Sequence, residues 1–152
     1  GVTLSAFIRS ALEQKTGKRV RLWDYKKKLA QTMELLSMDE SYAERDLNVG
    51  FSGGEKKKAE ILQMLMLEPS LAILDETDSG LDVDAVRTVS KGISIYKEQC
   101  RGSLLIITHS TRILESLHVD VTHVMEEGKI AREGDASLVD EINENGFEDI
   151  KA

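Results

Sequence analysis

The sequence contains one cysteine and one proline among its 152 residues, and only 5% of them are aromatic. A single cysteine cannot form a disulfide within the chain, which favours a reducing compartment such as the cytoplasm. No apolar run exceeds the length of a strand, so no direct insertion into a membrane is expected. The net charge of −7 disfavours nucleic acid as the main partner, because phosphate backbones are also negative.

The residues that are present suit a soluble globular protein, with 41% hydrophobic and 31% charged residues. Two apolar runs, Leu71–Leu74 and Leu104–Ile107, have the length and continuity of strands buried in a parallel sheet. Apolar residues at helical spacing occur over residues 2–14, 22–36 and 83–96. A hairpin is predicted from 121–126 and 129–132, followed by a short helix and an acidic tail through Asp149. The chain is therefore predicted to have an α/β fold.

Two adjacent glycines, Gly53 and Gly54, stand at the predicted start of a helix. Ser52 as N-cap and Glu55 three residues later would form a capping box, which explains these two polar residues without a ligand. It does not explain the glycines, which are poor helix formers. Bare backbone N–H groups at a helix N-terminus attract anions, so we interpret the segment as a phosphate-binding turn.

The first strand ends in a pair of carboxylates, Asp75 and Glu76, and His109 follows the second strand. Parallel strands present their carboxyl ends at one edge of a sheet, so we expect Glu76 and His109 to lie at the same edge. Carboxylates suit a hydrated magnesium ion and a base that activates water. Together with a phosphate-binding turn, they indicate nucleotide hydrolysis.

These segments resemble, in order, four motifs of the ABC ATPases. Residues 51–55 (FSGGE) resemble the signature motif, and Leu71–Glu76 resembles the Walker B strand. Ser79–Asp82 (SGLD) is similar to the D-loop, and His109 to the switch histidine. Within the superfamily the chain resembles the SufC-like branch, the soluble ATPases of the SUF iron–sulfur cluster assembly system. Thr77 and Glu55 support this branch, because ABC transporters usually have proline and often glutamine at these positions.

No G-x-x-x-x-G-K-[ST] phosphate loop occurs in the sequence. The resemblance implies that this loop lies upstream, and that the chain is the C-terminal part of an ABC ATPase domain whose sheet lacks its N-terminal strands. We expect a helical subdomain over residues 1–68, ending in the signature-motif helix. An α/β core over 69–134 and a C-terminal helix with an acidic tail over 135–152 would follow. This fragment alone is predicted to be inactive.

The resemblance also implies a role for each motif residue in binding and hydrolysing ATP. Asp75 would hold Mg²⁺ through water, Glu76 would orient and deprotonate the attacking water, and His109 would hydrogen-bond the γ-phosphate. The signature and D-loop residues would act across a dimer of ATPase subunits, on the nucleotide bound by the second subunit. They are Ser52, Gly53, Gly54 and Glu55, and Ser79, Gly80, Leu81 and Asp82. Asp82 is also predicted to be the N-cap of the following helix.

The partners implied by the resemblance are the SUF scaffold proteins, bound through the helical subdomain. Trp23 and Tyr25 are candidate anchors for a partner, although packing inside the subdomain is favoured for both. The run Lys26–Lys28 is interpreted as a solvated helix face. Cys100 is interpreted as inert, and His118 and His123 as structural.

Three other functions remain open. The chain could belong to the nucleotide-binding domain of an ABC transporter. It could come from a chromosome-maintenance or DNA-repair ATPase, although those proteins contain long coiled coils and no sustained heptads occur here. It could also be a non-catalytic module that binds a partner.

Overall fold

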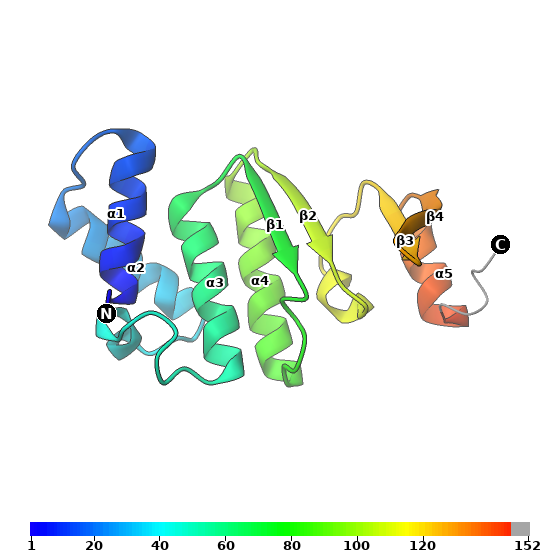
Figure 1. Cartoon of the computed structure of the whole chain (residues 1–152), viewed down its shortest axis with the longest axis horizontal. Helices are drawn as coiled ribbons and strands as arrows, with labels where there is room; N and C mark the ends of the chain where they lie inside the picture. Colours follow the sequence, from blue (N-terminus) through cyan, green and yellow to red (C-terminus); the bar gives the residue numbers. More distant parts are fainter. Residues whose placement is uncertain (147–152) are drawn as a thin grey trace. The chain divides into compact units, whose positions relative to one another are not determined.

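The computed structural model describes residues 1–146 and shows two compact units, one over residues 1–109 and one that begins at Ser110 (Figure 1). The sequence predicts a different division, into subdomains that follow the motifs and have boundaries after residues 68 and 134. This functional division remains a prediction. The α/β class predicted from the sequence is confirmed by the order of the helices and strands.

The chain opens with a helical part made of α1 (Leu4–Thr16), α2 (Leu22–Leu35) and a short 3₁₀ helix, η1 (Glu40–Glu44). Thr3 caps α1 by accepting a hydrogen bond from the Ala6 N–H, and α1 ends at Thr16 with Gly17 as its C-cap. Gly17 has a φ of 65°, a left-handed conformation that glycine adopts without strain. The predicted ranges of these helices agree with the structure to within about two residues.

The two aromatic residues of α2 face opposite environments. Tyr25 is buried, and its hydroxyl donates a hydrogen bond to the carbonyl of Ser5 (2.7 Å). Packing inside the helical part is therefore confirmed for Tyr25. It is wrong for Trp23, whose surface is 73% exposed. The two residues lie two positions apart on the helix, which places them about 200° apart around its axis.

The remainder of the first unit alternates helices and strands: α3 (Gly53–Leu67), β1 (Leu71–Asp75), α4 (Val83–Gln99) and β2 (Ser103–Ile107). Ser52 and Glu55 form the predicted capping box at the start of α3. The helix ends at Leu67, with Glu68 as its C-cap immediately before Pro69, which cannot continue the helix. Asp82 caps α4, as predicted, by accepting a hydrogen bond from the Ala85 N–H (2.8 Å).

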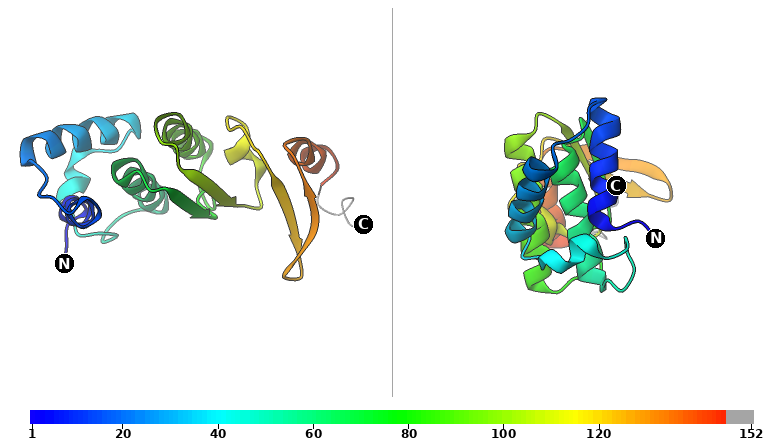
Figure 2. Two further views of the ribbon diagram at one scale, coloured as in Figure 1. Left: turned by 90° about the horizontal axis from the view of Figure 1, so that it is seen from above. Right: turned by 90° about the vertical axis from the view of Figure 1, so that its left-hand side faces the viewer.

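The strands β1 and β2 are parallel neighbours, and α3 and α4 cover one face of this two-stranded sheet (Figure 2). The covered face buries Ala72 and Leu74. On the other face, Leu71 and Ile73 are more than half exposed, and Leu105 and Ile107 nearly half. The expectation that these strands are buried on both faces is therefore wrong, because no described element packs against the second face.

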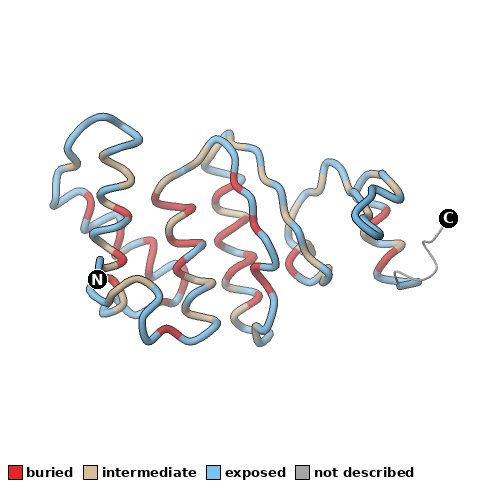
Figure 3. Tube along the Cα trace, in the orientation of Figure 1, coloured by how far each residue is buried: buried red, intermediate tan, exposed pale blue. Residues whose placement is uncertain are grey.

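Close packing between α3 and α4 forms the centre of the first unit (Figure 3). Gly92 of α4 is buried, and a methyl group built on it would come within 2.4 Å of Ile61 Cγ2 and 2.9 Å of Leu36 Cδ2. The absence of a side chain at Gly92 thus lets the two helices approach. At the far end of α4, the buried Tyr96 donates a hydrogen bond to the carbonyl of Pro69 (2.6 Å) and so ties α4 to the start of β1.

The second unit contains η2 (Thr111–Leu114), the hairpin of β3 (Thr122–Glu126) and β4 (Lys129–Gly134), and α5 (Ser137–Asn145). The hairpin is confirmed, with an antiparallel register and an irregularity between Val124 and Met125. Leu138 and Ile142 of α5 are buried, and Val124 packs against them. The acidic tail predicted through Asp149 lies partly outside the described residues. Among residues 1–146, no helix combines the length and apolar character required to span a membrane.

The packing at Gly92 gives a stability prediction. Gly92→Ala should lower the free energy of unfolding by roughly 1–3 kcal/mol through overpacking against Ile61 and Leu36. The loss of stability is expected although alanine is the better helix former by about 1 kcal/mol. Lys91→Ala, at the exposed neighbouring position, should stay within about 0.5 kcal/mol of wild type. Urea denaturation of both variants measures the difference, and a stabilising Gly92→Ala would contradict the packing described here.

Candidate functional site

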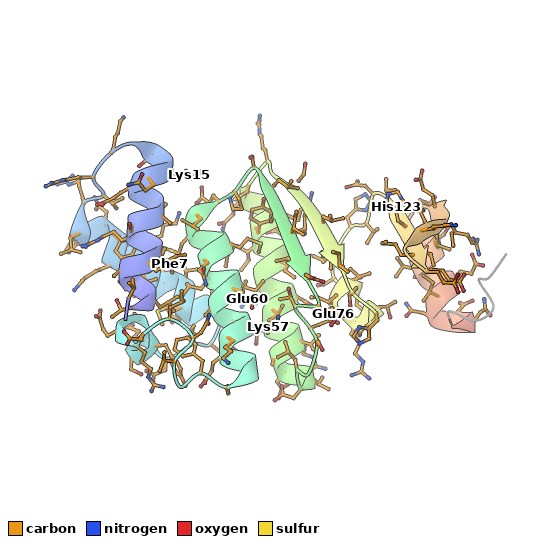
Figure 4. All side chains as sticks on the ribbon, in the orientation of Figure 1. Phe7, Lys15, Lys57, Glu60, Glu76 and His123 are labelled. Atoms are coloured by element: carbon orange, nitrogen blue, oxygen red, sulfur yellow. The ribbon has the colours of Figure 1, made fainter. Side chains whose placement is uncertain are left out.

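The carboxyl ends of β1 and β2 bring Glu76 and His109 together, and Figure 4 labels Glu76 beside the end of β1. Asp75, the last residue of β1, is paired with Ile107, the last residue of β2. The Glu76 N–H extends this pairing by donating to the Ile107 carbonyl (2.8 Å). His109 follows Ile107 by two residues, and its Nδ1 lies 3.4 Å from Glu76 Oε1. The expected placement of both residues at one sheet edge is confirmed, whereas their chemical roles remain a prediction.

Both side chains of this pair are accessible, with 69% of the His109 side chain and 55% of the Glu76 side chain exposed. Glu76 has a φ of 47°, a left-handed conformation that is uncommon for a residue with a side chain. Such conformations cost free energy and concentrate at functional sites. The turn therefore holds the Glu76 carboxylate outside the sheet, where it can meet a ligand and the imidazole.

Buried polar residues hold this turn in place. Thr77 is 2% and Asp78 is 8% exposed, directly after Glu76. The Thr108 hydroxyl lies within hydrogen-bond distance of both carboxylate oxygens of Asp78 (3.0 and 3.1 Å). Because Thr108 immediately precedes His109, this contact couples the turn after β1 to the turn after β2. The relative position of Glu76 and His109 thus depends on the strand pairing and on the Asp78–Thr108 contact.

An open recess beside the pair is lined by Lys57, Asp75, Glu76 and Ser79. Two carboxylates and a hydroxyl are hard oxygen donors, which suit Mg²⁺. In the described chain, however, no three histidine, cysteine or acidic side chains gather closely enough to hold a metal alone. The recess therefore fits a magnesium ion that retains water and takes its remaining ligands from phosphate oxygens. Asp75 and Glu76 are the residues that would face such an ion.

The sequence alone marks the run Lys56–Lys58 as surface charge that can help to attract polyphosphate, and it does not indicate that Lys57 lines this recess. It lies one helical turn after Gly53 on α3, and its ammonium contacts Glu60 Oε2 (3.3 Å). The spacing of four residues from the double-glycine turn was the available signal, because residues i and i+4 share one face of a helix. Lys57 brings a positive charge to the side of the recess that faces α3.

The double-glycine turn is open to solvent. Ser52 and Gly53 are exposed, and a methyl group built on Gly53 would meet nothing within 4 Å. A methyl group built on Gly54 would lie 3.9 Å from Leu81 Cδ2, an ordinary contact. Neither glycine has a positive φ. The fold therefore does not require glycine at these positions, which supports the interpretation that the bare backbone there serves a ligand.

Leu81, the neighbour of this turn, belongs to the segment Ser79–Asp82. Ser79 N–H donates to the Glu76 carbonyl (3.1 Å), and Asp82 caps α4. Ser79 and Gly80 are exposed, and Gly80 has a φ of 71° that suits glycine. The structure thus places the segment Ser79–Asp82 between the Glu76 turn and the double-glycine turn.

A cluster around Tyr42 orients the double-glycine turn and was not foreseen from the sequence. The Tyr42 hydroxyl donates to the Glu55 carboxylate, whose second oxygen accepts from the Ser52 N–H (2.7 Å). The Phe51 ring packs edge-on against Tyr42 (4.9 Å between centroids), and the Arg45 guanidinium lies over the Tyr42 ring (4.0 Å). The result is a continuous set of contacts from η1 to the start of α3.

The same contacts change the acidity of both partners. The hydrogen bond from Tyr42, followed by that from the Ser52 N–H, lowers the pKa of the Glu55 carboxyl below its usual value. The hydrogen bond to Glu55 raises the pKa of the Tyr42 hydroxyl. Glu55 therefore stays ionised, and Tyr42 stays a donor, at neutral pH.

The remaining titratable candidates form no comparable site. Burial raises the pKa of the Cys100 thiol, which keeps it protonated and weakly reactive at neutral pH. His118 Nε2 lies 3.5 Å from Asp120, and His123 Nδ1 lies 3.1 Å from Glu133 on the neighbouring strand. These local pairs agree with the structural interpretation of the two histidines.

Comparison with known proteins gives a family match and several close relatives. Residues 4–79 match the family described as ABC transporter. The chain is 46% identical to vegetative protein 296 of Bacillus subtilis, covering 99% of this chain and 58% of that protein. It is also 46% identical to a probable ABC transporter ATP-binding protein of Streptococcus pyogenes, covering 97% and 58%. With the probable ATP-dependent transporter SufC of Escherichia coli it shares 41% identity over 97% of the chain and 60% of that protein.

Among solved structures, the chain is similar to the dimeric post-hydrolysis state of an ATP-binding cassette bound to ADP and Pi. The TM-score is 0.73 over 88% of this chain and 56% of that chain, and the sequence identity is 16%. At this identity the likeness concerns the fold alone. The chain thus spans about three fifths of the length of the curated relatives it matches.

The lowered pKa of Glu55 gives a pH-dependent prediction for Glu55→Gln. A carboxyl whose pKa is lower in the folded state stabilises that state above its unfolded pKa, near 4.5, and this stabilisation is lost as pH falls through the folded value. Wild type should therefore exceed Glu55→Gln in unfolding free energy near neutral pH, and the difference should shrink progressively below about pH 4.5. Urea denaturation at several pH values measures it.

Tyr42→Phe provides the control, because it removes the largest cause of the lowered pKa. In that background the change in unfolding free energy caused by Glu55→Gln should depend less on pH. A change that is constant from pH 7 to pH 3 in the wild-type background would show that the Tyr42 contact does not act on Glu55.

Proposed function

The chain belongs to the ABC transporter family, and we propose that it forms part of a soluble ABC-type ATPase that drives iron–sulfur cluster assembly in the SUF system. The observation that carries the ATPase activity in this proposal is the Glu76–His109 pair, 3.4 Å apart at the carboxyl ends of neighbouring parallel strands. An acidic base and an imidazole at that edge suit the activation of water next to a phosphate. The hydrolysed substrate would be ATP.

We assign the roles around this pair from the chemistry of each residue and its position. Glu76 orients the attacking water and accepts its proton, because its carboxylate is exposed beside the recess. His109 donates a hydrogen bond to the γ-phosphate. Asp75 faces the recess and binds the magnesium ion through water. The bound magnesium ion supplies charge neutralisation at the phosphates.

The double-glycine turn and the segment Ser79–Asp82 would act in trans. Both are exposed, and they are neighbours through Gly54 and Leu81, so one surface presents them together. Ser52, Gly53 and Gly54 offer a hydroxyl and N–H groups at the start of α3, the arrangement that binds phosphate. We propose that this surface closes over the ATP bound by a second ATPase subunit. The dimeric cassette with a similar fold supports such a pairing.

The assignment to the SUF branch rests on particular residues. Glu55, where transporters often have glutamine, is used as an ionised acceptor by Tyr42 and by the Ser52 N–H. Thr77, where transporters usually have proline, is 2% exposed and follows the catalytic candidate directly. The 41% identity to SufC of Escherichia coli points the same way. The proposed partners are the SUF scaffold proteins, and the proposed location is the cytoplasm.

A transporter ATP-binding subunit is the second candidate, because a relative at 46% identity carries that name. Its motifs and chemistry would be the same, and only the partner would differ. A permease in the membrane would then replace the scaffold proteins as the protein that ATP binding and hydrolysis move.

The role of Glu76 predicts a specific kinetic defect. In a protein that contains this chain together with a phosphate loop, Glu76→Gln should lower the ATP hydrolysis rate by roughly 10²–10⁴-fold, because a general base is lost. The affinity for ATP should remain close to wild type. Single-turnover hydrolysis and equilibrium binding of a labelled ATP analogue measure the two quantities.

Glu133→Gln is a matched control, because it makes the same chemical change at an exposed position on β4. It should leave both quantities unchanged. Turnover that survives Glu76→Gln would refute the assignment of Glu76 as the base.

The identity of the proposed partner predicts which proteins co-purify with the ATPase. When the complete ATPase is isolated under native conditions, soluble cluster-scaffold proteins should accompany it, and a membrane permease should not. Recovery of a permease in stoichiometric amount would instead establish the transporter function and refute the SUF assignment.

A further inference from the structure

An exposed tryptophan lies in the first turn of α2. Trp23 is 73% and the adjacent Leu22 is 50% exposed. The opposite side of the same helix is well packed, with Tyr25, Leu29 and Met33 each no more than 4% exposed. The exposure of Trp23 therefore belongs to an ordered helix that is firmly fixed to the first unit. Large exposed aromatic residues on ordered elements are frequent anchors of protein interfaces.

Positive charge is concentrated around this tryptophan. Residues 15–28 contain seven basic residues and one acidic residue, Asp24, which gives the segment a net charge of +6. The whole chain carries −7, so the remaining residues carry −13. The basic residues are Lys15, Lys18, Arg19, Arg21, Lys26, Lys27 and Lys28. Residues 15–28 therefore oppose the negative charge of the rest of the chain.

Two of these lysines have a structural role. The Lys15 ammonium donates to the carbonyls of Leu67 and Glu68 at the end of α3 (2.5 and 2.7 Å). Lys28 forms a salt bridge with the Glu68 carboxylate (2.5 Å). Lysine near a helix C-terminus stabilises its carbonyl groups. Lys15 and Lys28 therefore fasten α1 and α2 to α3.

The other five basic residues have no such role in the fold. Arg21 contacts Asp24 (3.7 Å), but 90% of the Arg21 side chain remains exposed. Within residues 1–146, Lys18, Arg19 and Lys26 form no salt bridge. Figure 4 shows nitrogen-tipped side chains directed outward where α1 connects to α2. Leu22 and Trp23, with Lys18, Arg19, Arg21, Lys26 and Lys27, are called the Trp23 surface below.

Lys27 also orders the tryptophan. Its ammonium lies 5.4 Å from the centroid of the Trp23 ring, within the range of a cation–π contact. A ring held in this way loses less conformational entropy when a partner covers it. The Trp23 surface thus combines a pre-ordered aromatic anchor with a cationic surround, and it matches an apolar recess flanked by carboxylates.

We propose that the Trp23 surface binds an acidic, apolar-centred patch on the protein with which the ATPase assembles. The indole enters the recess, and the surrounding cations pair with carboxylates at its rim. This inference rests on the proposed function, which names the scaffold proteins as that partner. It adds the residues that make the contact and the charge that the partner must carry.

The two other anionic partners fit less well. Single-stranded nucleic acid binds to several aromatic side chains along a basic groove, whereas Trp23 is the sole tryptophan of the chain and stands next to a leucine. An amphipathic helix that binds a membrane presents an apolar face along its length. On α2 that face is already committed to the core through Tyr25, Leu29 and Met33.

The single tryptophan makes the experiment direct, because its fluorescence reports on this surface alone. Purified SUF scaffold proteins are titrated into the 152-residue chain at low and high salt. We expect a blue shift of the emission and an affinity that falls as salt rises. Trp23→Ala should weaken binding by roughly 30-fold or more, the effect of a hot-spot residue. Because this variant lacks the tryptophan, its binding is measured by light scattering or calorimetry.

A pair of charge-matched variants tests the cations. Arg19→Glu with Lys26→Glu should lower the association rate about tenfold or more at low salt, and less at high salt. Arg87→Glu with Lys91→Glu makes the same charge change on the exposed side of α4 and should have little effect. Circular dichroism of all variants tests whether the changes at these exposed positions leave the fold intact.

The outcomes separate the two proposals. If the scaffold proteins bind wild type and Trp23→Ala equally, the inference on the Trp23 surface is wrong while the proposed function stands. If they bind neither, the proposed function fails and this inference fails with it.

Parallel titrations use vesicles of phosphatidylglycerol and a single-stranded oligonucleotide. A salt-sensitive blue shift with either probe, in place of one with the scaffold proteins, would overturn the assignment of a protein partner.

Discussion

The parallel pairing of β1 with β2 is the contact on which the geometry of the site depends. It aligns Asp75 with Ile107, and the hydrogen bond from the Glu76 N–H to Ile107 carries the alignment one residue beyond the strand. A shift of the register by one residue would turn side chains to the opposite face and separate Glu76 from His109. The covered face of the sheet fixes this register, because only one alternation buries Ala72 and Leu74 beneath α3 and α4.

Several residues combine a structural and a proposed chemical task. Ser52 and Asp82 cap helices, and both belong to segments proposed to contact nucleotide across a dimer. Glu55 closes a capping box while it accepts a hydrogen bond from Tyr42. The helix starts therefore hold the functional segments in fixed orientations. Gly53 and Gly54 differ from these residues, because the local packing does not require glycine at either position. They are the residues for which a ligand gives the clearest explanation.

The sequence predicted the elements and their caps well, because helix periodicity, capping residues and the single proline are local signals. It also predicted the proximity of Glu76 and His109, since parallel strands end at a common edge. It did not predict the Tyr42 cluster, because the partners are 13 residues apart and joined by an irregular segment. The burial of β1 on both faces was wrong for a different reason. An apolar run shows that a strand is apolar on both faces, and it does not show whether a covering element exists. Trp23 was assigned to the core on its residue type, although the spacing of Tyr25, Leu29 and Met33 marks the buried side of α2 and leaves Trp23 outside it.

The uncovered face of the sheet and the Trp23 surface should respond to solution conditions in opposite ways. Leu71, Ile73, Leu105 and Ile107 form an apolar patch without charge, and contacts of this kind strengthen on warming and in the presence of sulfate. Contacts made by the cations around Trp23 weaken when ions screen them. Storage of the purified chain therefore involves a compromise. Cool buffer of low ionic strength suppresses self-association through the apolar patch of the sheet. The same buffer is the condition under which the Trp23 surface attracts acidic contaminants most strongly.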